Sequence, residues 1–113
     1  MIKEAYCSYE VSKLLKEKGM NKGYFTYYTQ KNNADGTSEA VTTCTHQMAM
    51  AWLREVHKLP INIWYDKEED ILDDEVWTSE IAVDRPSYIL VGSFASYEEA
   101  CEAALKYCLE NLI

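Results

Sequence analysis

Histidine and cysteine are the residues of this chain that come closest to a metal-ligand pattern, in the set Cys44, His46 and His57. A structural zinc ion needs four ligands about 2.0–2.3 Å from one point. On a helix that rises about 1.5 Å per residue, the two histidines stand about 16 Å apart and cannot share an ion. Cys44 with His46 makes half a site, and no second half is apparent. We therefore expect no metal ligands.

The sequence indicates catalytic residues no more clearly than it indicates metal ligands. Nucleophilic catalysis needs a serine or cysteine beside a histidine and an orienting acid, and Cys44 near His46 is the nearest approach. Carboxylates are so frequent that pairs of them carry no information, and the four glycines form no phosphate-binding motif. We expect no catalytic residues, no cofactor and no enzymatic activity.

The acidic segment 66–75 can be compared with a calcium-binding loop. Asp66, Glu68 and Asp70 occupy its first, third and fifth positions. Ile71 stands where a glycine is required, and Trp77 where the bidentate glutamate belongs, so the motif fails. A solvated hairpin loop is the favoured interpretation, with partner binding or weak cation attraction as the alternative.

Tyrosine is unusually frequent, with nine residues, and Tyr24, Tyr27 and Tyr28 fall in one short segment. Tyrosine suits an interface because its ring is apolar while its hydroxyl can remain in water. The alternative is that alternate members pack in the core and the others are ordinary strand residues. If the chain exposes an aromatic face, we expect it on this segment, as an edge used in self-association.

The charge balance bears on the class of partner. The formal net charge is −8, with 19 acidic and 11 basic residues, so nucleic acid and anionic membrane surfaces are repelled. No apolar run approaches the roughly 20 residues of a membrane span, and the first residues lack the apolar core of a secretory signal. We expect a cytoplasmic protein whose four cysteines are reduced and serve as small buried hydrophobes.

Local patterns predict the elements of the first part of the chain. A helix over 9–18 lies between Ser8, a good N-cap, and Gly19, suited to a left-handed C-terminal cap. Aromatic and β-branched residues predict a strand over 23–30, followed by a polar turn over 31–39. The segment 40–44 either returns as a partner strand or leads into the next helix.

The second part of the chain predicts a helix, three strands and a helix. The first helix, over 46–57, follows the N-cap Thr45. Strands are expected over 60–66, 76–83 and 88–94, where residues alternate or β-formers gather. Ser96 and Glu99 form a capping box at the start of the last helix. The expected apolar stripes are Met48, Ala49, Trp52, Leu53 and Val56 on the first helix, and Ala100, Ala103, Ala104, Tyr107, Cys108 and Leu112 on the last.

These elements predict one α+β domain with the order α-β-(β)-α-β-β-β-α. An antiparallel meander would carry helices on one face. Residues 1–44 would form an extension of a helix and an aromatic strand, and residues 45–113 the α-β-β-β-α unit.

The element order from Thr45 onward resembles that of the double-stranded RNA-binding domain. At the last helix this family typically has a serine, two lysines, any residue, an alanine and a lysine, followed by an alanine pair. The corresponding residues here are Ser96, Tyr97, Glu98, Glu99, Ala100 and Cys101, then Ala103 and Ala104. The resemblance implies the same topology and packing. Because Tyr97, Glu98 and Cys101 replace the phosphate-binding lysines, we do not expect RNA binding to be retained.

A second resemblance covers nearly the whole chain. Its segments 9–11, 13–19, 45–50, 52–55 and 97–111 look like small uncharacterised proteins from phages and prophages of gut Bacteroides. That family implies an origin and no activity.

The resulting expectation is a non-catalytic, acidic interaction protein of phage or prophage origin that binds another protein or itself. The alternatives are a nucleic-acid-mimicking inhibitor of a host protein and a degenerate RNA-binding-type domain. No membrane partner is expected, and nucleic acid is disfavoured. The candidate interaction surface comprises Tyr24, Tyr27, Tyr28, Asp66, Glu68, Glu69, Asp70, Asp73, Asp74 and Glu98.

Overall fold

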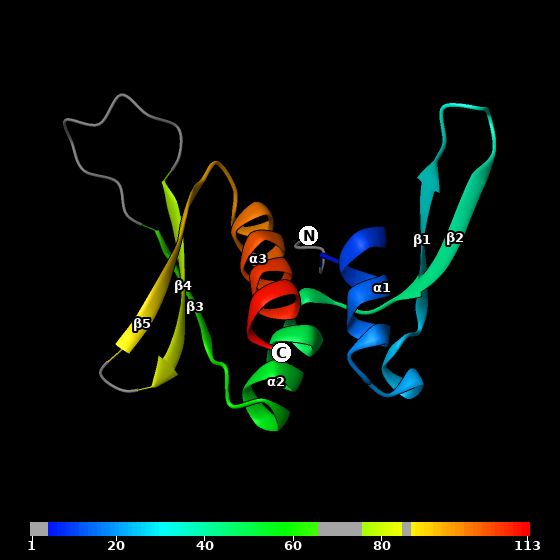
Figure 1. Cartoon of the computed structure of the whole chain (residues 1–113). Helices are drawn as coiled ribbons and strands as arrows, with labels where there is room; N and C mark the ends of the chain where they lie inside the picture. Colours follow the sequence, from blue (N-terminus) through cyan, green and yellow to red (C-terminus); the bar gives the residue numbers. More distant parts are fainter. Residues whose placement is uncertain (1–4, 66–75, 85–86) are drawn as a thin grey trace.

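Helices and two separate antiparallel sheets make up the structure, a computed structural model that describes residues 5–65, 76–84 and 87–113 (Figure 1). The helical segments are α1 (Tyr9–Glu17), the 3₁₀ turn η1 (Lys22–Tyr24), α2 (His46–Val56), α3 (Tyr97–Tyr107) and the π-helical end η2 (Cys108–Leu112). The strands are β1 (Tyr27–Asn32), β2 (Ser38–Thr43), β3 (Ile61–Tyr65), β4 (Trp77–Asp84) and β5 (Ser87–Phe94). The α+β class and the element order predicted from the sequence are confirmed.

The helices lie between the two sheets (Figure 1). Strands β3, β4 and β5 form an antiparallel meander in that order, and α3 packs against one face of it. Strands β1 and β2 form a hairpin on the other side of the molecule, where they pack against α1. Among the described helices, none is long and apolar enough to cross a membrane.

The helix starts follow the predicted capping residues. The side-chain oxygens of Ser8, Thr45 and Ser96 accept hydrogen bonds from the backbone N–H groups three residues later, at 3.2, 3.2 and 3.1 Å. Each bond satisfies a donor that the first helical turn leaves unpaired. The start of every long helix is therefore set by local chemistry.

The first strand begins later than predicted. Lys22–Tyr24 forms a 3₁₀ turn because the Asn21 side chain accepts a hydrogen bond from the Gly23 N–H, and β1 starts only at Tyr27. Tyr24 is thus outside the strand that was expected to carry all three tyrosines. Of the two alternatives for segment 40–44, the partner strand is right, since β2 pairs with β1 from Ser38 to Thr43.

The buried faces of α2 and α3 agree in part with the predicted stripes. The predicted positions that are buried are Ala49, Leu53, Ala100, Ala104 and Cys108. Met48, Val56 and Tyr107 are exposed instead, and the buried residues that were not predicted are His46, Met50, Cys101 and Leu105. Apolar residues surround much of both helices, so periodicity alone leaves the orientation open, and packing against neighbouring elements selects the face.

One core cluster joins the two expected parts of the chain. Leu15 of α1, Leu53 of α2, Ile81 of β4 and Leu105 of α3 all belong to it and are fully buried. In the segment before α1, the Cys7 N–H donates to the Cys44 carbonyl at 2.9 Å, and the Ala5 carbonyl accepts from the His46 N–H at 3.0 Å. This short antiparallel bridge places the N-terminal segment against the start of α2.

Candidate functional site

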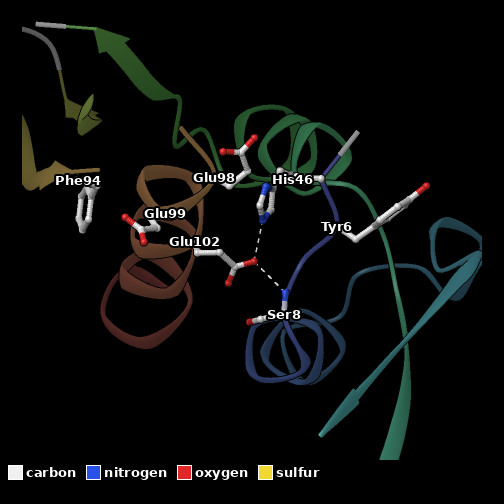
Figure 2. Close-up of a pocket in the computed structure, with 8 residues that line it drawn as sticks. Tyr6, Ser8, His46, Phe94, Glu98, Glu99 and Glu102 are labelled. Carbon is white, nitrogen blue, oxygen red and sulfur yellow. Dashed lines mark hydrogen bonds and ion pairs between the residues drawn. The ribbon is translucent and has the colours of Figure 1, made fainter. Parts of the chain in front are cut away.

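A carboxylate on α3 connects the starts of the other two long helices. One oxygen of Glu102, Oε1, lies 2.7 Å from His46 Nε2 and accepts a hydrogen bond from the Ser8 N–H at 2.8 Å. Figure 2 shows both groups pointing at this carboxylate from α2 and from the N-terminus of α1. Three segments far apart in the sequence thus meet at one oxygen atom.

The surroundings of Glu102 keep it ionised. Burial raises its pKa, but the hydrogen bonds from His46 and Ser8 outweigh that effect, so the pKa lies below its usual value. The Glu102 side chain is 27% exposed and the His46 side chain 4% exposed. Glu102 therefore reaches solvent, whereas His46 is enclosed by the protein.

Cys7 adds a sulfur atom to this pair. Its Sγ, a ring nitrogen of His46 and a carboxylate oxygen of Glu102 all lie within 4.8 Å of one another. A hydrogen bond with the Cys44 thiol, burial and the neighbouring Glu102 charge together raise the pKa of Cys7 far above its usual value. With Cys7 only 1% exposed, the thiol is neutral and inaccessible, which is the opposite of what a cysteine nucleophile requires.

A pocket of about 510 Å³ gives access to this cluster. Its lining residues are Ala5, Tyr6, Ser8, His46, Phe94, Glu98, Glu99 and Glu102. Apolar and acidic side chains share the lining, and no lysine or arginine is among the described residues that form it. The arrangement suits a cation better than an anion.

The three candidate tyrosines do not share one surface. Tyr24, on η1, lines a different pocket with Met48 and Trp52 of α2. The Tyr27 ring packs on Tyr6, with 4.4 Å between ring centroids, while Tyr28 is 78% exposed. Only Tyr28 stands free on the hairpin in the manner that an interface residue would.

Beyond Tyr28, toward the hairpin turn, one face of the hairpin exposes side chains without charge. At its other end this face stops at Thr42, which lies opposite Tyr28; the Thr42 hydroxyl accepts a hydrogen bond from the Lys16 ammonium. We define the neutral face as Tyr28, Gln30, Asn32, Ser38 and Ala40, all of them exposed. Gln30 is opposite Ala40 and Asn32 is opposite Ser38 in the β1–β2 register, and side chains two apart on a strand share a face. The charged residues Lys31 and Glu39 alternate onto the other face, where they interact with Tyr9 of α1.

The acidic candidates are only partly described. Asp66, Glu68, Glu69, Asp70, Asp73 and Asp74 lie outside the described residues. Glu98 is exposed and lines the same pocket as Glu102. A nucleic-acid mimic would need segment 66–75 and the glutamates of α3 to form one continuous negative surface, and that segment lies outside the described residues.

Sequence reasoning missed Cys7 and Glu102 as partners of His46. The segment containing Cys44 and His46 did draw attention, but 56 positions separate His46 from Glu102 and no spacing pattern connects them. The structure supplies the neighbours that were not apparent in the sequence, because the N-terminal segment and α3 both pack against the start of α2. Comparison of the chain with protein-family models, with curated proteins and with solved structures found no match.

Proposed function

We propose that this chain is a non-catalytic protein-interaction domain, of phage or prophage origin, that contacts its partner through the neutral face of the β1–β2 hairpin. One observation carries the proposal. In a chain with 27% charged residues and a net charge of −8, five adjacent exposed side chains on a two-stranded hairpin bear no charge.

The composition of the neutral face fits a protein contact. Charged residues are depleted at the centre of protein interfaces, and tyrosine is enriched there. Tyr28 offers a large ring that loses little conformational freedom on binding, and the surrounding amide and hydroxyl groups can donate or accept hydrogen bonds. The hairpin extends beyond the N-terminal end of α1, so a partner can approach it (Figure 1).

The backbone of the hairpin supports the same proposal. Within residues 5–65, 76–84 and 87–113, neither β1 nor β2 pairs with a third strand. Exposed strand edges in monomeric proteins are usually protected by charges or prolines. The charged residues of these two strands, Lys31 and Glu39, are engaged with Tyr9 of α1, and an exposed edge can accept a strand from a partner. A strand added beside β1 or β2 would lie next to the neutral face.

The test is capture of a partner by the tagged chain. Phage resemblance points to nuclease-treated lysate of a gut Bacteroides host, with the bound proteins identified by mass spectrometry. Tyr28→Glu places a charge on the largest side chain of the neutral face, and we expect it to reduce capture of the partner at least tenfold, since a desolvated unpaired charge is strongly unfavourable.

The matched control is Tyr88→Glu. Tyr88 is 62% exposed on β5, so both substitutions add the same charge to an exposed tyrosine of a strand. Equal capture by both variants would contradict the assignment of the surface. Recovery that nuclease abolishes would favour the RNA-binding alternative, and a concentration-dependent mass in light scattering would indicate that the partner is a second copy.

A further inference from the structure

We propose that Cys7, His46 and Glu102 form a three-donor binding site for a zinc-class transition metal ion, whose fourth position is open to a water molecule. The inference goes beyond the proposed function and uses different residues. Thiolate sulfur, imidazole nitrogen and carboxylate oxygen are the donors that zinc takes in proteins. Here one of each lies within 4.8 Å of the others.

The distances between the three donor atoms are close to those found around a bound zinc ion. Donor atoms about 2.0–2.3 Å from a tetrahedral zinc ion stand roughly 3.3–3.8 Å from one another. His46 Nε2 and Glu102 Oε1 are 2.7 Å apart, and the largest separation in the trio is within 4.8 Å. Movements on the order of 1 Å would therefore bring the three donors to bonding distance.

Cys7 is held at this site by its backbone and by its thiol. The Cys7 N–H donates to the Cys44 carbonyl at 2.9 Å, in the short antiparallel bridge between the N-terminal segment and the start of α2. The Cys7 thiol donates to the Thr45 carbonyl, with 3.8 Å between sulfur and oxygen. A bound metal ion would replace the thiol proton, which leaves to solvent as the thiolate binds.

The histidine ring is free to make the adjustment. His46 is 3% exposed, and its Nδ1 atom is buried without a hydrogen-bond partner in the described part of the chain. The ring can shift without breaking a hydrogen bond on that side.

The charges of the cluster favour a cation. Three glutamates line the adjoining pocket, and within residues 5–65, 76–84 and 87–113 no lysine or arginine lines it. A divalent ion would supply the missing positive charge, and the pocket provides its route to His46 and Glu102. Because the ligands come from the segment before α1, from α2 and from α3, the bound ion would fasten three segments together.

The decisive measurement uses the full chain, reduced and stripped of metal with a chelator. On titration with Co²⁺ we expect the absorption bands of tetrahedral cobalt–thiolate coordination, saturating at one ion per chain and abolished by one equivalent of Zn²⁺. Zn²⁺ should also raise the midpoint of thermal unfolding, because a ligand that binds the folded state stabilises it. Absence of the cobalt bands in the folded chain would overturn the proposal.

Substitutions then assign the ligands. Cys7→Ser and His46→Gln should each weaken Zn²⁺ binding by on the order of 100-fold or more, by comparison with the 10–100-fold effects of outer-shell partners. The matched controls are Cys108→Ser, which alters another fully buried cysteine, and His57→Gln, which alters the other histidine.

Unchanged affinity in both controls is expected. Equal weakening by Cys7→Ser and Cys108→Ser would overturn the assignment, because it would indicate loss of folding rather than of a ligand. If Cys7→Ser fails to fold, the cobalt spectrum of the wild-type chain decides by itself. Tyr28→Glu should bind Zn²⁺ normally, so failure of the metal site and failure of the hairpin interface are distinguishable.

Discussion

At the scale of single residues, the four cysteines share burial but differ in surroundings. The prediction that they are buried is confirmed, and it describes Cys101 and Cys108 well. Burial raises the pKa of Cys101 to about 11 and that of Cys108 to about 12. Cys7 and Cys44 differ because each has a second thiol as its neighbour. The same residue type therefore serves as packing at Cys101 and Cys108 and as a candidate metal ligand at Cys7.

The Cys108 thiol should make the protein less stable at alkaline pH. Below its ordinary pKa of 9.0 the thiol is protonated in both the folded and the unfolded chain. Its contribution to the free energy of unfolding is then fully present. Between pH 9.0 and about 12 the unfolded chain ionises while the folded chain does not. The free energy of unfolding then falls with rising pH, by up to about 1.4 kcal/mol per pH unit for this group.

Urea denaturation at several pH values above the ordinary thiol pKa measures this slope. Cys108→Ala removes the titrating group, so we expect a shallower decline, whatever its effect on stability at neutral pH. Ionisation of the tyrosines contributes equally to the pH slopes of the wild type and the variant, because both proteins retain them. Equal slopes in the two proteins would contradict the prediction.

At the scale of elements, α1 ends as its sequence requires. Gly19 has φ +93°, a left-handed conformation that residues with a Cβ atom rarely adopt. The Met20 N–H donates to the Leu15 carbonyl at 3.0 Å, and the Gly19 N–H donates to the Lys16 carbonyl at 3.1 Å. These bonds form a Schellman motif, which satisfies carbonyl groups that the end of the helix leaves free.

Gly19→Ala should lower the free energy of unfolding by about 1 kcal/mol, because a left-handed conformation costs about 1–2 kcal/mol for a residue with a Cβ atom. No heavy atom lies within 4 Å of the added Cβ, so the cost is conformational rather than steric. Gly23→Ala is the matched control, since Gly23 does not have a left-handed φ. Chemical denaturation of both variants measures the difference, and equal stabilities would refute the explanation.

At the scale of the whole molecule, the core cluster crosses the boundary drawn between residues 1–44 and 45–113. Leu15 from α1 belongs to the same cluster as Leu53, Ile81 and Leu105. A core shared in this way predicts that the chain unfolds as one unit. The three tryptophans, Trp52, Trp64 and Trp77, all lie after Thr45 and report on the second part alone.

Leu15→Ala should therefore destabilise the whole chain. Leu15 is fully buried, and removal of a buried leucine side chain typically costs 2–5 kcal/mol, which includes the cavity that it leaves. We expect the tryptophan-fluorescence and far-UV circular-dichroism midpoints to shift together in urea. A tryptophan transition that stays in place while α1 unfolds would show that the extension is a separate unit.

The sequence by itself determined the local features of this protein. Ser8, Thr45 and Ser96 mark the helix starts, Gly19 marks a helix end, and residue alternation identifies the meander, because capping bonds and side-chain periods involve only neighbouring residues. Tyr28 was likewise selected from a local run of tyrosines, although the neutral face around it depends on the register with β2.

Only the tertiary structure decided which helix faces are buried and which side chains meet His46. Apolar residues around α2 allow more than one orientation, and the choice depends on α3 and on the N-terminal segment that pack against it. Glu102 is 56 positions from His46 and 94 from Ser8. No local pattern records such a contact, since it exists only after three helices have packed into one core.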